Sequence, residues 1–470
     1  MKKVFKILIA SLLIISFSYF IYLLSDLGFL SNKYLLIGCL ALVIIMFIII
    51  VGLFKFKNKI LKILLGIICF MLSIINCAGI YYLNSTLSFI DNIGNNKEEY
   101  NYYYVMSLKS SNYENISDLK NKIIGKTESL EKEAIEKLKI DYKEKVYENA
   151  EGLLNNLYDK KIDAIFISDV EAYMLEEEVS DFTVMTKIIH TIKIKKQEEV
   201  IEQVSKDVSK EPFIAYISGI DTNGSISKVS RSDVNIVVTV NPSTYQVLLT
   251  TIPRDYYVQL HGTTGTKDKL THAGIYGINM SITTIEDLLG VDISYYARVN
   301  FDTVTHLVNQ IGGVDIYSDQ NLKFCNIKQG YNHLDGACAL RFARERKSYK
   351  TGDRHRGENQ EEVIKAIINK VQNTPSLLTK YNSILSNLEG DFETNASNEM
   401  IKSLIKLQIK EMPKWIVKTS NLDGFDSHNY TYSGGRNKLY VMEPDMTTVE
   451  NTKIIINSIL EGKTFDEIGI

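Results

Sequence analysis

Arginine is scarce in this 470-residue chain. The first 230 residues contain none, and the whole sequence has nine arginines against forty-four lysines. Eight of the nine lie between Arg231 and Arg356. Lysine therefore serves wherever the chain needs only a solvated positive charge, and one window requires guanidinium groups. A guanidinium is a planar fork that binds a carboxylate or a phosphate through two hydrogen bonds, and it stays charged at ordinary pH.

Proline, cysteine and net charge are also low, and each limits the class of protein. The six prolines exclude a rigid proline-rich stalk. A net charge of −3 lacks the basic excess of many nucleic-acid-binding proteins, so we expect no nucleic-acid partner. Three of the five cysteines lie in apolar runs near the N-terminus, where they act as small apolar residues. Cys325 and Cys338 could form a disulfide, which the sequence leaves open.

Three uncharged apolar runs occupy residues 7–24, 34–54 and 63–82. A helix needs roughly 20 residues to cross about 30 Å of hydrocarbon, and each run is close to that length. Buried core helices are the alternative, but three such runs in succession are rare in soluble domains. A cleaved signal peptide is disfavoured because the first run is long and two more follow it. We therefore predict three transmembrane helices within residues 1–83.

Lysines around these runs predict the orientation in a plasma membrane. Lys2, Lys3 and Lys6 precede the first run, and four lysines lie in or beside the second loop. The first loop carries one lysine and one aspartate. Because positively charged loops stay in the cytoplasm, the N-terminus is expected inside and everything after residue 82 outside. An external position would remove DNA and ATP as ordinary partners of the arginine window.

Residues 84–101 are predicted to form a polar connector, and residues 102–210 a small α/β accessory domain. The accessory pattern is strand, helix and strand up to residue 125, followed by an apolar run and a helix-like segment at residues 162–175. The sequence of these strands and helices resembles half of an extracellular solute-binding protein, which would permit ligand sensing. No polar constellation supports a ligand site, and a spacer that lifts the next domain off the membrane is the favoured interpretation.

Residues 211–470 are predicted to form a larger α/β/α domain, because strands and helices alternate throughout. One helix shows apolar residues along a single face between residues 361 and 371. The expected strands are residues 213–218, 234–240, 245–251, 295–300 and 314–317, and the other expected helices are residues 281–289 and 301–311.

Two acids flank the first loop of this larger domain. Asp221 follows the first strand and Asp233 precedes the second. If these strands are neighbours, both carboxylates lie at one end of the sheet. Two hard oxygen ligands with open positions suit Mg²⁺, or Mn²⁺ in its place. Taken alone, an aspartate at a strand end is more often a turn or cap residue.

Arg254 directly follows the third strand, at the same expected end of the sheet. Arg344, Arg346 and Arg356 add more positive charge than two acids can neutralise, and alternate positions would place Arg344 and Arg346 on one face of an extended segment. Some of these arginines could instead pair with nearby acids, namely Glu345, Asp353 and Glu358. A solvated, salt-bridged surface is the plain explanation. Guanidinium groups beside a divalent cation nevertheless fit a pyrophosphate or polyphosphate, which we favour.

The chain resembles the LytR–CpsA–Psr family, and specifically its members with several membrane helices and an accessory domain. The matching segments, in order, are ISGIDTNG, SRSDVNIVVTVNPST, LLTTIPRDYYV, DKLTHAGIYG, YYARVNFDTVTHLVNQIGGVDI, LDGACALRFARER, GDRHRGENQ and YVMEPDMTTVENTKIIINSIL. This resemblance implies a phosphotransferase of Gram-positive-type cells. It would transfer a glycopolymer, such as teichoic acid or capsule, from an undecaprenyl-pyrophosphate carrier to peptidoglycan on the outer face of the membrane.

The resemblance also implies roles for individual residues. Asp221 and Asp233 would hold Mg²⁺ at the pyrophosphate. The family often has Gly-Arg-x-x-Arg-Gln-Gln, whereas here Asn359 replaces an arginine and His355 stands where glycine is usual. The implied catalytic residues are Asp221, Arg231, Asp233, Arg254, Arg344 and Arg346. The implied pyrophosphate-binding residues are Arg254, Lys269, Arg344, Arg346, Arg356 and Gln360.

The expected reaction is attack by a peptidoglycan sugar hydroxyl on phosphorus, with lipid phosphate as the leaving group. Arginines and a metal ion would supply positioning and charge stabilisation. The general base stays open, because metal ligation lowers the basicity of Asp221 and Asp233. His272 and His355 are weaker candidates, since polar residues commonly surround a polar site. A receptor for lipid-linked sugars or solutes and a polyprenyl-pyrophosphate hydrolase are the alternative functions.

Overall fold

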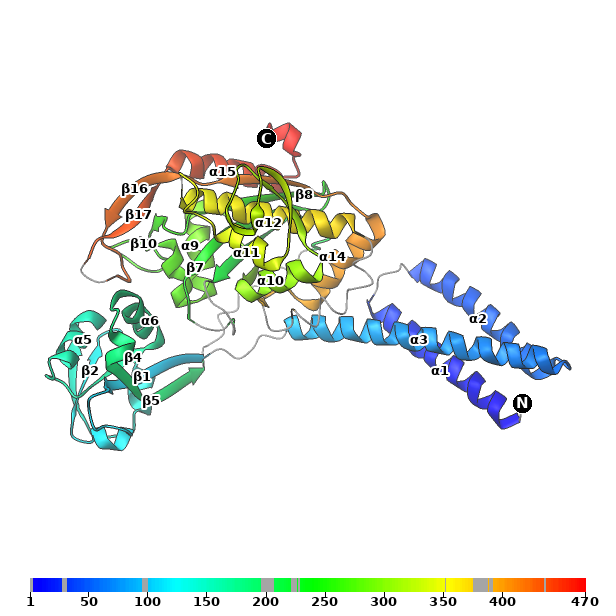
Figure 1. Cartoon of the computed structure of the whole chain (residues 1–470), viewed down its shortest axis with the longest axis horizontal. Coiled ribbons are helices and arrows are strands. Elements are labelled where there is room, and N and C mark those ends of the chain that lie inside the picture. Colours follow the sequence, from blue (N-terminus) through cyan, green and yellow to red (C-terminus); the bar gives the residue numbers. More distant parts are fainter. Residues whose placement is uncertain are drawn as a thin grey trace.

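Figure 1 shows the computed structural model of the chain, in which three long helices extend away from two folded units. The structure describes residues 3–27, 32–94, 100–195, 207–220, 226, 229–350, 352–374, 388, 392–434 and 437–470.

The three apolar runs form the helices α1 (Lys3–Leu27), α2 (Asn32–Lys55) and α3 (Lys59–Gly94). Each contains a segment that is long and apolar enough to cross a membrane. Many of their large apolar side chains are exposed, which is unfavourable in water and supports the predicted membrane anchor. The helix α3 runs on to Gly94, into the stretch for which the sequence predicts a polar connector.

The accessory domain is built on a five-stranded sheet in the order β3-β2-β4-β1-β5. Its strands are β1 (Tyr100–Leu108), β2 (Ile123–Thr127), β3 (Lys143–Tyr147), β4 (Ala164–Ser168) and β5 (Thr186–Lys195). Alternate residues of β4 feed two cores, because Phe166 packs on one face of the sheet and Ile167 on the other. Its helices are η1 (Ile116–Leu119), α4 (Lys132–Lys137), α5 (Ala150–Tyr158), α6 (Asp169–Glu178) and α7 (Phe182–Met185).

A six-stranded sheet in the order β14-β11-β6-β7-β8-β15 forms the centre of the larger domain. Its strands are β6 (Phe213–Ile220), β7 (Ser232–Asn241), β8 (Gln246–Thr251), β11 (Tyr295–Val299), β14 (Phe392–Thr394) and β15 (Ile416–Asn421). Strands β6, β8, β11 and β15 run in one direction, and β7 and β14 run in the other. The carboxyl ends of the first four and the amino end of β7 therefore lie along one edge, which we call the site edge.

Helices cover both faces of this sheet and give three layers (Figure 1). These helices are α9 (Ile278–Leu289) and α15 (Met446–Leu460) on one face, and α10 (Phe301–Gln310), α11 (Gly336–Arg344) and α12 (Asp353–Asn373) on the other. Neighbouring strand residues serve different layers. Val237 packs with α9 and α15, whereas Ile236 packs with Ile364 of α12. The predicted α/β/α architecture is confirmed.

Shorter elements complete the larger domain around these layers. Three two-stranded hairpins pair β9 with β10, β12 with β13, and β16 with β17. They are β9 (Tyr257–Val258), β10 (Asp268–Lys269), β12 (Val314–Ser318), β13 (Gly330–Leu334), β16 (Gly424–Asn429) and β17 (Leu439–Pro444). The remaining helices are α8 (Leu270–Ala273), η2 (Gly274–Tyr276), η3 (Phe324–Asn326), α14 (Asn398–Glu411) and α16 (Phe465–Ile468).

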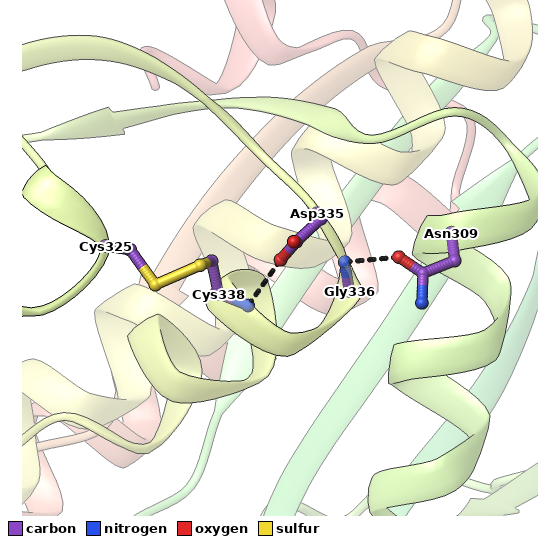
Figure 2. Close-up of a disulfide and its surroundings, with 5 residues drawn as sticks. All are labelled: Asn309, Cys325, Asp335, Gly336 and Cys338. Carbon is purple, nitrogen blue, oxygen red and sulfur yellow. Dashed lines mark hydrogen bonds between the residues drawn. A yellow bond between two sulfur atoms is a disulfide. The ribbon is translucent and has the colours of Figure 1, made fainter.

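A disulfide joins Cys325 of η3 to Cys338 of α11, so the pairing that the sequence left open is present (Figure 2). Asp335 caps α11, since its Oδ1 accepts a hydrogen bond from the Cys338 backbone N–H at 2.8 Å. The Gly336 backbone N–H donates to Asn309 Oδ1 of α10 at 2.8 Å. A Cβ at Gly336 would lie 2.2 Å from a backbone oxygen of α10, so only glycine fits there. These contacts fix the start of the helix that carries Arg344.

Replacing both Cys325 and Cys338 with serine is expected to lower the free energy of unfolding of the larger domain by about 3 kcal/mol, because the bridge closes a short loop. The measurement is chemical denaturation monitored in parallel for the wild type and the double variant. A reducing agent should destabilise the wild type to the level of the double variant and leave the variant unchanged. Equal stability of the two proteins under oxidising conditions would contradict the prediction.

Candidate functional site

The site edge brings together residues that are far apart in the sequence. Ile220, at the end of β6, pairs with Ser232 at the start of β7, so the two strands are neighbours as the sequence argument required. The ends of β8 and β15 pair beside them, with Thr251 opposite Asn421. Asp221 directly follows β6 but lies outside the described residues.

Asp233, the second residue of β7, is held by two hydrogen bonds. Arg254 Nη1 donates to its Oδ2 at 2.7 Å, and Thr271 Oγ1 donates to its Oδ1 at 3.0 Å. Burial raises the pKa of this carboxyl, but the guanidiniums of Arg254, Arg356 and Arg231 outweigh burial and lower the pKa below its ordinary value. Asp233 is therefore ionised at neutral pH and offers hard oxygen atoms to a divalent cation.

A cavity of about 180 Å³ lies at the site edge. Asp233, Arg254, Arg356 and Gln360 line it, and all four are residues that the sequence assigned to the site. They come from the start of β7, the segment after β8 and the first turns of α12. Arg356 and Gln360 are four residues apart on this helix, so they share one face of it. The fold thus brings two separate sequence motifs to one cavity.

A second carboxylate, that of Asp255, also lies close to the Arg254 guanidinium. Asp255 is buried, and its Oδ2 lies 3.4 Å from Arg254 Nε. Its Oδ1 accepts a charge-assisted hydrogen bond from Lys269 Nζ at 2.9 Å. Lys269 is therefore linked to Arg254 through a shared acid. This places the predicted phosphate-reaching lysine one side chain away from the cavity lining.

Arg354, which the sequence analysis did not assign to the site, also lines the cavity. Its Nε lies 2.7 Å from Asp423 Oδ1, and its Nη2 donates to the Gly424 backbone carbonyl. Asp426 lies farther away, at 3.7 Å from Nη2. These contacts tie the first turn of α12 to the segment between β15 and β16. The guanidinium thus fixes the position of Arg356, two residues later, relative to the sheet.

The family of this chain follows from comparison with known sequences. The model of the LytR_cpsA_psr family matches residues 180–453. The chain belongs to this LytR–CpsA–Psr family. The transferase TagU of Bacillus anthracis, named for polyisoprenyl-teichoic acid and peptidoglycan, is 34% identical over 217 residues, covering 45% of this chain and 70% of that protein. The similarly named TagV of Bacillus subtilis is 31% identical over 267 residues, covering 54% of this chain and 66% of that protein.

Solved structures of similar proteins are also known. The crystal structure of B. subtilis TagV has 31% sequence identity and a TM-score of 0.44, and the match covers 54% of this chain and 98% of that chain. The structure of TagT bound to LIIa-WTA has 24% identity and a TM-score of 0.44, covering 58% of this chain and 97% of that chain. The family predicted from the sequence is confirmed by the match of the family model.

In this LytR–CpsA–Psr protein, Arg344 and Arg346 do not appear among the described residues that line the cavity. Helix α11 ends at Arg344, so the two arginines are not alternate residues of an extended segment. The Arg344 guanidinium lies 4.0 Å from the centre of the Phe301 ring. Phe301 begins α10 directly after β11, at the site edge. Arg344 therefore faces this edge on the β11 side, which is also where β6 leads to Asp221.

The two histidines considered in the sequence have structural partners. His272 is buried and its Nδ1 lies 2.7 Å from Asp268, a fully buried carboxylate that also accepts from the Ser433 backbone N–H. His355 lies 3.0 Å from Glu358 and stacks on a tyrosine ring. Asn359, at the family's arginine position, is 4% exposed. A buried amide therefore stands at this position of α12.

Glu361 is a buried carboxyl that the sequence analysis did not identify. It is 3% exposed and lies next to Gln360 of the cavity lining. Burial raises its pKa to about 8, against hydrogen bonds from Thr251 and Asn421. With its amide turned to donate, Asn421 Nδ2 lies 2.7 Å from Glu361 Oε1. Glu361 is therefore largely neutral at neutral pH. It contacts Thr251 and Asn421, which both line the cavity.

Replacing Glu361 with glutamine is expected to flatten the pH dependence of stability. The ordinary pKa is 4.5 and the folded pKa is about 8, so between these values the unfolded chain releases the proton that the folded chain retains. The wild type should therefore lose stability as pH rises from 5 to 8. The gap in favour of the variant should reach on the order of 2–4 kcal/mol at pH 8.

Thermal unfolding at a series of pH values measures this effect. Glu450→Gln on α15 is the matched control, because it makes the same chemical change at a side chain that is 58% exposed. Parallel pH profiles for the wild type and Glu361→Gln would show that Glu361 ionises normally in the folded protein.

Proposed function

We propose that this chain transfers a glycopolymer of the teichoic acid class from a polyprenyl-pyrophosphate carrier to a peptidoglycan hydroxyl. The observation that carries the proposal is the convergence of Asp233, Arg254, Arg354 and Arg356 on one cavity. The curated relatives are named teichoic acid transferases, and the enzyme class predicted from the sequence is confirmed to that level. Undecaprenyl pyrophosphate is the carrier that the sequence analysis favours.

The charge balance of the cavity favours a pyrophosphate that arrives with a cation. The lining holds three guanidiniums, but Asp233, Glu358 and Asp423 line it too. Glu358 is one of the acids that the sequence offered as partners for the arginines, and Asp423 is a further one that comes from the segment after β15. Arg254 pairs with Asp233. A phosphate can therefore bind the Arg254 guanidinium only if another positive charge neutralises the Asp233 carboxylate. A divalent cation at Asp233 would do so and leave Arg254 and Arg356 for phosphate oxygens.

Mg²⁺ fits the residues at this edge. The described residues contain no group of three or more His, Cys, Asp or Glu side chains that could hold a metal ion. Mg²⁺ usually keeps several waters and takes one or two carboxylates together with substrate phosphates, so a full protein cage is not required. The ionised Asp233 would be one ligand and Asp221 the second. When bound, the ion would offset charge that develops on the phosphate oxygens.

The residues of the chain would act mainly by positioning. The acceptor hydroxyl oxygen forms a bond to the phosphorus that carries the polymer, and the bond from that phosphorus to the lipid phosphate oxygen breaks. The hydroxyl proton is lost to a base that no described contact identifies. Arg254 and Arg356 would stabilise the charge on the reacting phosphate, and the Gln360 amide can donate to it. Lys269 holds Asp255, which orients Arg254.

An outer-face location is part of this proposal. The disulfide between Cys325 and Cys338 belongs to an oxidising compartment. The lysines before the first helix and beside the second loop predict a cytoplasmic N-terminus under the positive-inside rule. Three crossings would then carry both folded domains to the exterior, on the same side of the plasma membrane as the peptidoglycan of a Gram-positive-type cell.

One assay tests the function. The purified full-length chain is incubated with a prenyl-pyrophosphate-linked sugar, peptidoglycan fragments and Mg²⁺. A phosphodiester-linked product supports the proposed transfer. Release of phosphate or lipid phosphate without that product would instead indicate a hydrolase, and unchanged substrate with retained binding would indicate a receptor.

Asp233→Asn is expected to lower transfer by about a hundredfold or more, because the variant keeps the shape of the side chain but loses the charge that binds a cation. The rate should not recover at high Mg²⁺. Product formation is measured at several Mg²⁺ concentrations, with thermal unfolding as the check on folding. A rate within twofold of the wild type would contradict the assigned role.

Arg344→Ala is expected to abolish transfer while the fold is retained, because Arg344 faces the site edge at the end of α11. Arg341→Ala is the matched control on the same helix, where the Arg341 guanidinium stacks on Phe324 instead. Both variants lose one arginine and one cation–π contact. Equal activity of the two variants would remove Arg344 from the proposed site.

A further inference from the structure

Helix α6 of the accessory domain contacts the segment that leads to Asp233. Glu177 Oε2 lies 2.7 Å from Arg231 Nη2. Tyr173 lies one helical turn earlier on the same face. Burial is the main cause of the raised pKa of its hydroxyl, and the nearby Arg231 and Ser230 act in the opposite direction. Figure 1 shows α6 on the side of the accessory domain that faces the larger domain.

The accessory domain presents this face from a fixed helix. The Ser168 hydroxyl accepts from the Glu171 backbone N–H, and the Glu171 side chain accepts from the Ser168 backbone N–H at 2.9 Å. Leu175, between the two contact residues, is buried in the accessory core. Because residues two apart point to nearly opposite sides of a helix, Tyr173 and Glu177 face away from that core.

Arg231 links this contact to the site. It lies two residues before Asp233 and directly before β7, at the site edge. Its terminal nitrogen is bound to Glu177. Its Nε is buried and has no hydrogen-bond partner among the residues that the structure describes. The accessory domain therefore holds the outer end of the guanidinium, while its Nε faces the interior.

We propose that Glu177 is a positioning residue for the transfer reaction, and that the accessory domain completes the site by orienting the Arg231 guanidinium. This inference rests on the proposed function. The side chains of Arg231 and Glu177 are 28% and 39% exposed, and pairs with this exposure add little to stability. The contact is therefore better explained by orientation of the arginine than by a need to hold the chain together.

The test compares three variants of the full-length chain. Glu177→Gln should lower kcat/KM for the lipid-linked donor about tenfold, because a misplaced charged group loses transition-state stabilisation. Glu177→Asp should recover part of that loss, since it keeps the carboxylate. Glu176→Gln is the control with the same charge change on a neighbouring face of α6, and it should match the wild type.

A second measurement does not depend on activity. Hydrogen exchange of the backbone at residues 229–234 should increase in Glu177→Gln and stay unchanged in Glu176→Gln, because only the first variant frees the segment that α6 contacts. If the wild type transfers nothing, the proposed function has failed, and hydrogen exchange alone decides whether the contact exists. The inference is overturned if Glu177→Gln equals Glu176→Gln in both measurements. A rise in activity for Glu177→Gln would also overturn it, since Glu177 would then compete with an anionic ligand for Arg231.

Discussion

The ion pair between Arg254 and Asp233 is the constraint on which the site depends. Both side chains are mostly removed from water, and a buried charge is tolerated only when it is paired and hydrogen-bonded. The pair joins the start of β7 to the segment after β8, so it can form only if these strands are antiparallel neighbours in their observed register. Fold and site chemistry are therefore specified by the same interaction.

The surrounding charges form a chain rather than a free positive patch. Asp255 connects Arg254 to Lys269, and Arg354 connects α12 to Asp423. Each link fixes the direction of a guanidinium before any ligand arrives. Preorganised charge of this kind stabilises a developing negative charge without a further cost of reorientation. The same pairing means that an anionic substrate has to displace or offset carboxylates, which is why a cation fits the arrangement.

Local patterns predicted much of this fold. The apolar patterns of β6, β7 and β8 and the apolar face of α12 are visible in the sequence. The expected strand ends put Asp233 and Arg254 at one edge of the sheet, and the family resemblance supplied their roles. The rest depends on long-range pairing. Strand β15 joins the sheet beside β8 from the far end of the domain and brings Asn421 to the edge. No local sequence pattern predicts the position of Asn421. The burial of Glu361 could not be predicted either, because it depends on contacts with Thr251 and Asn421 from two other strands.

The scarcity of arginine is explained by what the described guanidiniums do. Arg254 and Arg354 each reach two acidic side chains, which exploits the planar fork. Arg341 and Arg344 lie over aromatic rings, where a flat, weakly hydrated cation packs better than an ammonium group. Lysine could supply the charge in each case but neither the fork nor the flat face. The chain uses arginine where direction matters, and Arg231, bound across two domains, follows the same rule.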